Sequence, residues 1–449
     1  MSIVRRAALA LAATAALTTA AQAGGFSRGS ANLEGLYAGN DGTDPVTGYA
    51  GVTYVAPGRS GDITVDINGT LIDSGNQEFS EDFAVPFASV GLRLTDAARC
   101  VGSYAEPYGA ASSYTGAATF SVSEQSIDTY ELGLTCSYGF KAGRGMAYAI
   151  GGVFHEDLRY QQARDFRVLD ALTMGAITTG ATDFSRIDVD STDIGYRLGL
   201  AYEIPEIALR ASLLYRSETT HDVEGQFTDT PFQFIFGARA QGLANAAADL
   251  VTAASQPGVP ADVAAGLLAQ AQQLGLAAQE QLALAGAAGM TQTAGAFGTA
   301  TLPRSLELNF QTGVNPRTLV FGSAKWTDWS VVQRIDLNDT ISGNPFTDFE
   351  GFFRDGYTVT LGVGRKITEE LSGSLAATWD RGVGTGFDTF SDTYTVAGGF
   401  AYDLNDLVNV RAGGALIYFT EAEQTQGDFL VQSDGEFGYA LSGSLSIKF

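Results

Sequence analysis

The sequence predicts an all-β protein, a transmembrane barrel of about fourteen antiparallel strands. Three observations carry this prediction. The chain begins with an export signal, several of its strands are long enough to cross a bilayer, and short connections alternate with long ones. Together they disfavour a β-sandwich, whose strands are shorter, and a helical membrane protein, which needs long apolar segments.

Residues 1–23 are typical of a cleaved signal peptide. Arg5 and Arg6 are followed by a short apolar run, which ends in the small-residue pattern Ala-Gln-Ala at 21–23. The run is shorter than the roughly 20 apolar residues that a spanning helix requires. We therefore expect a mature chain that starts at Gly24, is exported, and resides in a Gram-negative outer membrane.

The composition fits a membrane barrel and excludes one class of partner. The 449 residues include 55 Gly, 18 Tyr and 27 Phe, but only 11 Pro. Acidic residues outnumber basic ones by 50 to 26, which leaves a net charge of -24. Nucleic acid is therefore not an expected partner, because phosphate contacts need Lys and Arg.

The last fourteen residues form the longest alternating segment. One face carries large apolar residues and the other carries small or polar ones, as expected for a strand between lipid and a polar interior. The apolar face comprises Phe437, Tyr439, Leu441, Leu445, Ile447 and Phe449. A tilted strand needs about 9–11 residues to cross a bilayer. A terminal Phe on such a strand resembles the signal read by the barrel assembly machinery, which we expect as a partner together with outer-membrane lipid.

The same alternation recurs along the chain. It is clear at residues 130–140, 196–203, 207–216, 306–311 and 394–402. Within a bilayer every backbone polar group must find a partner inside the protein, so strands of this kind have to close into a barrel.

Connection lengths give the strand count and the orientation. Tight links, such as Pro205-Glu206, alternate with long polar ones, such as Val331 to Gly351. Outer-membrane barrels place short turns in the periplasm and long loops outside. We count seven strands between Tyr49 and Gln226 and seven from Leu302 to Phe449. The weakest are the second and third, near residues 83–94 and 101–108.

Short motifs along the chain resemble the FadL-type family of outer-membrane proteins. The similarity is firmest from Leu302 to the C-terminus and patchy before it. The motifs are Leu302-Pro303-Arg304, Lys325 to Ser330, Phe349 to Phe352, Asp355-Gly356-Tyr357, Tyr215-Arg216-Ser217, Glu106 to Gly109, Gly25-Phe26 and Gly35 to Gly39.

This resemblance implies a barrel of fourteen strands, residues 49–449, whose lumen is plugged by an N-terminal hatch, residues 24–48. It also implies passive uptake of long-chain fatty acids or other hydrophobic small molecules, with a sideways exit through the wall. A water-filled pore would forfeit about 0.8 kcal/mol of burial for each CH₂ group. The hatch is short and lacks the family's Asn-Pro-Ala box. A porin-like channel for small polar or aromatic solutes is therefore the alternative.

Residues 241–299 interrupt the strand pattern. The segment is rich in Ala, Gln and Leu, and Pro257 and Pro260 divide it, which predicts an extracellular pair of helices joined at a proline break. Two interpretations remain open: an apolar platform that catches hydrophobic substrate, or a low-complexity loop without stable order.

Carboxylate recognition would require a basic group that faces the lumen. Arg197, Arg210 and Arg216 have the inward parity, while Arg159 and Arg354 lie near extracellular strand ends. Each of them could instead pair with an acidic residue of the lumen. The family resemblance adds Phe26, which corresponds to an N-terminal aromatic residue beside the inner pocket.

The remaining candidates for chemistry are few. Cys100 and Cys136 fall on neighbouring strands, where they would form either a cross-strand disulfide or two buried thiols. His155 and His221 are the only histidines, and neither stands at a spacing typical of a metal site or a catalytic triad. We therefore predict neither an enzyme nor a metal or cofactor site.

Overall fold

A computed structural model describes residues 26–37, 45–67, 70–165, 184–228, 232–288, 293–386, 388–426 and 429–449. The predicted signal peptide, residues 1–23, lies outside the described residues. So do residues 24–25 and 38–44 of the predicted hatch.

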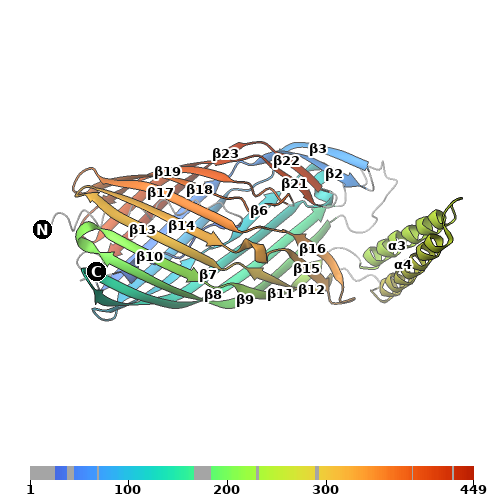
Figure 1. The fold of residues 1–449 in the computed structure, drawn as a ribbon, viewed down its shortest axis with the longest axis horizontal. Helices are drawn as coiled ribbons and strands as arrows, with labels where there is room; N and C mark the ends of the chain where they lie inside the picture. The colour runs from blue at the N-terminus through green and yellow to red at the C-terminus, as the bar shows by residue number, and fades with distance from the viewer. Residues whose placement is uncertain are drawn as a thin grey trace.

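The wall is a closed antiparallel barrel of fourteen strands (Figure 1), as the sequence predicted. It closes because the first strand pairs with the last strand on one side and with β4 on the other. The first strand begins at Val46, three residues before the predicted start of the barrel at Tyr49.

In their order around the barrel, the wall strands are β1 (Val46–Ala56), β4 (Phe83–Arg93), β5 (Ala98–Ala105) with β6 (Gly109–Ser113), β7 (Glu124–Ala142), β8 (Gly145–Asp165), β9 (Phe184–Ile204), β10 (Leu209–Arg216) with β11 (Thr219–Thr228), β12 (Thr293–Leu302) with β13 (Ser305–Asn315), β14 (Thr318–Thr327) with β15 (Arg334–Asp339), β16 (Pro345–Glu350) with β17 (Gly356–Lys366), β18 (Leu371–Asp380), β19 (Thr393–Asp403), β20 (Val408–Phe419) and β23 (Glu436–Lys448).

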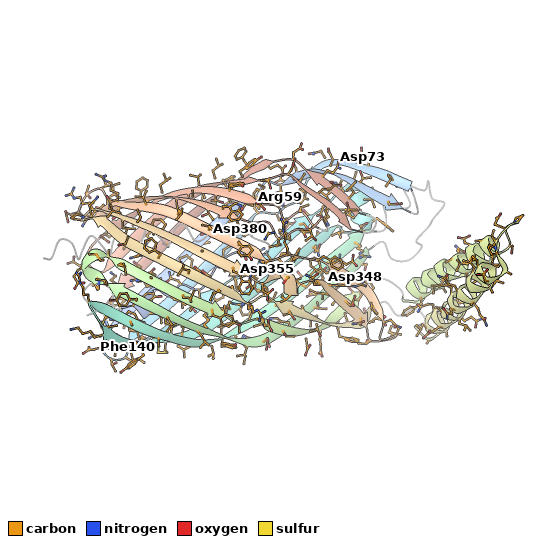
Figure 2. The ribbon with its side chains drawn as sticks, in the orientation of Figure 1. Arg59, Asp73, Phe140, Asp348, Asp355 and Asp380 are labelled. Carbon is orange, nitrogen blue, oxygen red and sulfur yellow. A yellow bond between two sulfur atoms is a disulfide. The ribbon has the colours of Figure 1, made fainter. Side chains whose placement is uncertain are left out.

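The alternation seen in the sequence separates lipid from lumen. On β7, Leu132 and Leu134 are exposed on the outer surface, whereas Glu131 and Thr135 are buried inside. Phe140, near the barrel end that holds the C-terminus, is also exposed (Figure 2). The wall therefore presents apolar side chains to the bilayer and keeps its polar side chains in the lumen.

The hatch segment, residues 26–37, packs against the inner wall. Its 3₁₀ turn η1 (Glu34–Leu36) inserts Leu36, which is fully buried against Val101 and Ile150. The Ser137 hydroxyl donates a hydrogen bond of 2.6 Å to the Leu36 carbonyl oxygen. A polypeptide segment therefore occupies part of the lumen, as the sequence predicted for a hatch.

The barrel end opposite the C-terminus, here called the loop end, carries a small four-stranded sheet that the sequence did not reveal. It consists of β2 (Ser60–Ile67), β3 (Thr70–Glu78), β21 (Ala422–Gln426) and β22 (Phe429–Ser433). Ile63, Val65, Phe79, Phe429 and Val431 form its core. The sheet joins two loops far apart in sequence and covers one side of the barrel mouth (Figure 1).

Two helices, α3 (Phe232–Ala254) and α4 (Ala261–Ala288), form a hairpin at the loop end, as the sequence predicted (Figure 1). Their bounds differ from the expected insertion at 241–299, because α3 begins at Phe232 and β12 begins at Thr293. Small alanines every second residue, Ala294 and Ala296, pack inside the barrel, which makes the segment after Thr293 a strand. No helix in the described chain is both long and apolar enough to cross a membrane.

Candidate functional site: two cavities and a break in the wall

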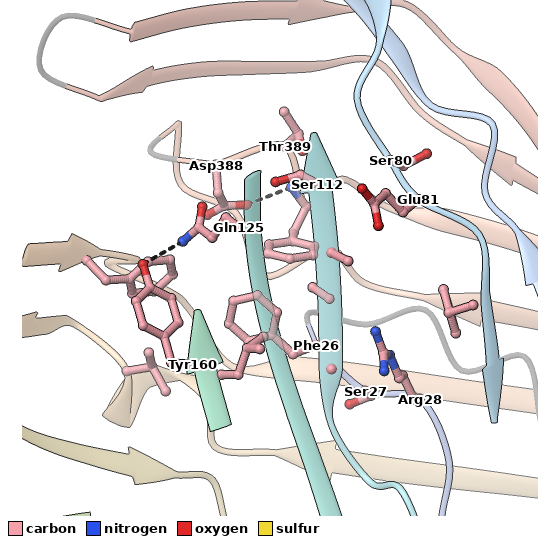
Figure 3. Close-up of a pocket in the computed structure, with 18 of the residues that line it drawn as sticks. Phe26, Ser27, Arg28, Ser80, Glu81, Ser112, Gln125, Tyr160, Asp388 and Thr389 are labelled. Carbon is pink, nitrogen blue, oxygen red and sulfur yellow. Dashed lines mark hydrogen bonds between the residues drawn. The ribbon is translucent and has the colours of Figure 1, made fainter. Parts of the chain in front are cut away.

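An apolar cavity of about 260 Å³ lies toward the loop end, beneath the small sheet (Figure 3). We call it the upper cavity. Its walls come from the hatch segment, from barrel strands on several sides and from the loop at residues 388–391. Apolar side chains dominate the lining, among them Val55, Phe83, Leu158, Val223, Leu302, Val332, Leu337 and Ile417. Such a lining suits an alkyl chain or an aromatic hydrocarbon.

Phe26 is the central aromatic residue of the floor. Its ring centroid lies 4.9 Å from that of Phe390, 5.6 Å from those of Trp329 and Phe353, and 6.0 Å from that of Phe349. Trp329 belongs to the 3₁₀ turn η4 (Trp329–Val331), which connects β14 to β15. The hatch segment thus contributes one aromatic ring, that of Phe26, to a cluster whose other members come from three loops of the barrel and from β16.

Two arginines line the upper cavity: Arg28, which pairs with Asp128 at 2.8 Å, and Arg59, which Figure 2 labels. Arg59 follows β1 in the chain and is 6% exposed. Its Nη1 atom donates to the Thr389 carbonyl oxygen at 2.5 Å, and its guanidinium lies 5.1 Å from the centre of the Phe419 ring. Its Nε and Nη2 atoms are buried and have no hydrogen-bond partner among the described residues. Burial lowers the pKa of Arg59 to about 10, so it keeps its charge at neutral pH.

Orphaned guanidinium nitrogens in an apolar cavity indicate a site for an anion. Leaving a buried donor unsatisfied costs about 1–3 kcal/mol, and more for a charged group. A carboxylate matches the fork of a guanidinium and can accept two of its hydrogen bonds at once. The upper cavity therefore combines an apolar body with one cationic end, the arrangement that an amphipathic acid requires.

Asp388 is the acidic neighbour of this site. Its Oδ1 atom accepts a hydrogen bond from the Phe390 backbone N–H at 2.6 Å, while its buried Oδ2 atom has no partner in the described chain. Burial raises the pKa of Asp388 to about 7, against the opposing effects of the Phe390 N–H, Arg59 and Arg354. Asp388 therefore changes charge near neutral pH, beside a cation that keeps its own.

A second cavity of about 250 Å³, the lower cavity, lies on the other side of the hatch segment. Its lining is charged. The arginines at the wall have acidic partners: Arg197 pairs with Glu131, and Arg216 pairs with Glu131 and with Glu156 at 2.5 Å. Arg210 donates to Glu203 at 3.0 Å and to Glu34 of the hatch segment at 3.1 Å. These buried ion pairs neutralise one another and leave a polar interior.

The barrel wall has a break in pairing beside both cavities. β4 pairs with β1 along ten residues, but on its other side only Ala88–Arg93 pair with β5. β6 pairs with β7 and not with β4. Phe83–Phe87 and Glu106–Ala110 thus face each other without a strand pairing between them. Pro86, which has no backbone N–H, lies on this edge. We call this break the wall gap.

The hatch segment fills the wall gap from inside. The backbone N–H of Arg28 donates to the Pro107 carbonyl oxygen at 2.9 Å, and that of Gly109 donates to the Phe26 carbonyl oxygen at 2.7 Å. Ser27 and Tyr108 form an antiparallel bridge. Residues 26–28 therefore take the place of a missing strand on one edge of the gap.

The structure separates the predicted ligand-binding residues into three groups. Phe26 lines the upper cavity, and Arg197 and Arg216 line the lower one, where acidic residues neutralise them. Arg159 pairs with Asp188 at 2.6 Å on the exposed surface. Arg354 is exposed, and its Nε atom donates to the Gly382 carbonyl oxygen at 3.0 Å. Neither of these two lines either cavity.

Sequence reasoning missed Arg59, Asp388 and Trp329. Arg59 and Asp388 lie in irregular connections, where parity says nothing about direction, and the small sheet that buries Arg59 had no signature in the sequence. The motif that contains Trp329 indicates a family resemblance in the sequence, but it does not indicate that this side chain lines a cavity. The one local signal near Arg59 is a glycine turn within three residues of it, and such turns are too common to identify a site.

Cys100 and Cys136 are joined by a disulfide between partnered positions of β5 and β7. Of the two histidines, His155 is exposed on the outer surface and His221 is fully buried beside Glu156. Among the described residues, no three His, Cys, Asp or Glu side chains gather in a way that could hold a metal ion.

The fold and the cavities define a class: a transmembrane β-barrel with a segment of its own chain in the lumen and an apolar cavity open toward the loop end. Residues 47–431 match the family model described as outer membrane protein transport protein (OMPP1/FadL/TodX). The chain belongs to this family, whose members transport hydrophobic small molecules across the Gram-negative outer membrane. The loop end is accordingly extracellular, and the C-terminus lies at the periplasmic end.

Solved structures agree with this assignment at the level of the fold. A Pseudomonas aeruginosa FadL homologue is 16% identical with a TM-score of 0.65, and the match covers 96% of this chain and 98% of that one. The Pseudomonas putida toluene transporter TodX is 13% identical with a TM-score of 0.53, covering 96% and 97%. The CymD monoaromatic hydrocarbon channel is 12% identical with a TM-score of 0.52, covering 90% and 89%. No protein of curated function matches the sequence.

Proposed function

We propose that this protein takes up hydrophobic molecules that carry a carboxylate, above all long-chain fatty acids, by passive diffusion with a sideways exit into the membrane. The observation that carries the proposal is Arg59, a buried cation with two unsatisfied nitrogens in a cavity whose lining is mostly apolar. A fatty acid would place its carboxylate on Arg59 and its chain against the apolar wall.

Magnitudes favour an acid over a neutral hydrocarbon. Both kinds of cargo gain about 0.8 kcal/mol for each CH₂ buried in the upper cavity. Only the acid also gains a charge-assisted hydrogen bond to Arg59, which contributes about 1.5–3 kcal/mol. A neutral aromatic molecule such as toluene would leave the two Arg59 nitrogens unsatisfied. The aromatic floor around Phe26 alone would accept either cargo, so Arg59 decides between them.

The lower cavity supports the sideways route. An alkyl chain that continued down the lumen would displace water from Glu131, Arg197 and Arg216, and that desolvation costs free energy. The wall gap, in contrast, borders the upper cavity at Phe83 and opens between strands whose outer faces are apolar, as at Val90 and Leu132. For a hydrophobic chain, the route through the wall gap therefore costs less free energy than the route down the lumen.

The second candidate function is a porin-like channel for small polar or aromatic solutes. The polar lining of the lower cavity favours it. Against it stands the position of residues 26–28 and the aromatic cluster, which occupy the lumen between the two cavities. An open pore would require the hatch segment to leave this position.

The test is uptake of labelled oleate by Gram-negative cells that lack their own fatty-acid transporter and carry this protein. We expect Arg59→Gln to reduce uptake by about tenfold or more, because one charge-assisted hydrogen bond is worth at least a factor of ten. Arg354→Gln, which removes an exposed arginine at the same end, should leave uptake unchanged. A labelled sugar is the control for an open pore. Unchanged uptake in Arg59→Gln, or sugar entry that rises with expression, would overturn the proposal.

A further inference from the structure

One hatch residue, Arg28, lies at the meeting point of the two cavities and the wall gap. It is the residue that the linings of the upper and the lower cavity share among the described residues. Figure 3 shows it below Glu81, next to Ser27. Arg28 therefore lies where the two cavities meet, next to Phe83 and Gly109, which line the upper cavity and border the wall gap.

The contacts of Arg28 span the wall gap. On one edge, its guanidinium lies 4.5 Å from the centre of the Phe83 ring on β4. On the other edge, its Nη1 atom pairs with Asp128 of β7 at 2.8 Å, and its backbone N–H is bonded to Pro107. The next residue, Gly29, also fits between the edges, since a Cβ there would lie 3.3 Å from Val85. Arg28 thus holds together two strands that do not pair with each other.

The two partners of the ion pair differ in their exposure. The Arg28 side chain is 6% exposed, whereas that of Asp128 is 55% exposed. Asp128 can therefore move outward, whereas Arg28, once unpaired, is a buried charge that needs another anion. Arg28 stays buried, and its Nε atom is buried with no partner among the described residues. A second carboxylate could take the place of Asp128 without adding charge to the interior.

Gly109 sets how closely the guanidinium fits against the wall. A Cβ at position 109 would lie 2.4 Å from Cζ of Arg28. Real Cβ atoms do not approach other atoms so closely. Any side chain at position 109 would therefore displace the Arg28 guanidinium from its position against the wall. The position offers a way to disturb Arg28 without altering a charge.

We propose that the Arg28–Asp128 ion pair is a latch on the wall gap, and that the carboxylate of the cargo opens it by replacing Asp128 on Arg28. The exchange frees residues 26–29 from the edge formed by Pro107 and Gly109, and the gap then opens toward the lipid. Arg28 is accordingly a second carboxylate subsite, after Arg59. This inference rests on the proposed function, because it takes the cargo to be an amphipathic acid.

The exchange makes uptake selective for acids. A carboxylate replaces a carboxylate, so the buried guanidinium stays paired throughout. An uncharged molecule of the same shape has no carboxylate to replace Asp128 on Arg28, so the ion pair stays closed. The latch therefore discriminates by charge at the exit, in addition to any preference at the entrance.

The first test compares uptake of labelled oleate with that of oleyl methyl ether, an uncharged molecule of similar length. In cells with the wild-type protein, oleate should enter faster. Asp128→Asn, which weakens the latch, should raise ether uptake about fivefold, as expected for the loss of a partly exposed ion pair. The ratio of the two rates should therefore fall. Gly109→Ala should act in the same direction, because it displaces the guanidinium.

Glu369→Gln is the matched control. It removes an exposed carboxylate from a buried cation, Lys366, in an ion pair of 3.1 Å at the opposite end of the barrel, with exposures of 5% and 59% that resemble those of Arg28 and Asp128. It should leave the ratio of the two rates at its wild-type value. An effect of similar size in Glu369→Gln, or an unchanged ratio in both Asp128→Asn and Gly109→Ala, would contradict the latch. A general loss of stability would lower both rates and leave their ratio unaltered.

The second test closes the latch covalently. Ser27 and Tyr108 are bridge partners, so Ser27→Cys with Tyr108→Cys should form a disulfide that ties the hatch segment to the edge of the gap. We expect the oxidised double variant to lose oleate uptake and to regain it on reduction. Wild-type protein with and without reductant, and each single variant, control for the Cys100–Cys136 bond and for the loss of the tyrosine.

Binding of labelled oleate to purified protein in lipid nanodiscs separates the two proposals. The oxidised double variant should still bind oleate, because Arg59 and the upper cavity are intact. If it binds oleate and also takes it up at the wild-type rate, the latch is wrong and the proposed function stands. If wild-type protein binds no oleate, the proposed function and the latch both fail.

Discussion

The upper and the lower cavity are similar in size and lie in one barrel, yet the arginines that line only one of them differ: those of the lower cavity are paired, and Arg59 of the upper cavity is not. In the lower cavity, Arg197, Arg210 and Arg216 each have an acidic partner. In the upper cavity, Arg59 has backbone and aromatic neighbours but no ion pair in the described chain. The difference teaches that a buried arginine alone is no ligand site. An arginine that is paired with an acidic residue stabilises the fold, whereas an unpaired arginine has free donors that can bind an anionic ligand.

The largest effect is expected from breaking a pair in the lower cavity. Glu131 is 1% exposed and accepts hydrogen bonds from both Arg197 and Arg216. Glu131→Gln leaves two buried cations short of charge, which typically costs about 3–5 kcal/mol of unfolding free energy. Urea unfolding in lipid vesicles, followed by tryptophan fluorescence, measures it. Asp188→Asn, at an exposed pair, should cost less than about 1 kcal/mol. Equal losses in the two variants would refute the structural role given to the lower cavity.

A smaller effect is expected when Arg59, the unpaired cation of the upper cavity, is given an acidic partner. The Arg59 guanidinium lies 5.1 Å from the centre of the Phe419 ring, so Phe419→Glu places a carboxylate beside it. Arg59 would then resemble the arginines of the lower cavity, and oleate would have to compete with an internal acid. Oleate binding, measured in nanodiscs, should be about tenfold weaker than in Phe419→Gln, which has the same shape without the charge. Similar affinities in the two variants would show that Arg59 does not bind the carboxylate.

A smaller effect should follow from pH. Because burial raises the pKa of Asp388 to about 7, its side chain is neutral below that pH and charged above it. The charged form attracts Arg59 and repels an incoming anion, so binding should weaken as pH rises from 6 to 8, by at most about tenfold per unit. Dodecanesulfonate is the suitable probe, since its own charge does not change. Asp388→Asn should bind it equally at both pH values; a slope that persists in this variant would assign the titration to another group.

The smallest effect is expected at the helical hairpin. Leu268, Leu276 and Leu282 of α4 are exposed by 47%, 61% and 59%. If the hairpin is the predicted platform that catches hydrophobic substrate, Leu268→Ser with Leu276→Ser should slow uptake two- to threefold at limiting oleate and not at saturation. These helices stand outside the barrel wall, so the unfolding free energy of the barrel should change by less than about 0.5 kcal/mol. Normal uptake at limiting oleate would leave the hairpin without this role.

The alternation of side chains along each strand predicted part of the site and could not predict the rest. It placed Arg197 and Arg216 in the lumen correctly, because side chains in a strand alternate strictly between the two faces. It could not tell that both are neutralised, because Glu131 and Glu156 lie on other strands and pairing across strands depends on register. Arg159 has the outward-facing neighbour Asp188 for the same reason. Phe26 follows from the family resemblance, and its four aromatic contacts come from three loops and from β16, which no local pattern connects.

What the sequence determined by itself is the barrel: a period of two over long segments, with apolar and polar faces, leaves a closed sheet as the only way to satisfy every backbone group in lipid. It also determined the count of fourteen, since tight turns and long loops alternate. Only the tertiary structure decided which cations are free, where the wall lacks pairing and what fills that gap. Those properties depend on residues far apart in the chain, such as Arg28 with Asp128, and no local periodicity encodes a contact between an irregular segment and a distant strand.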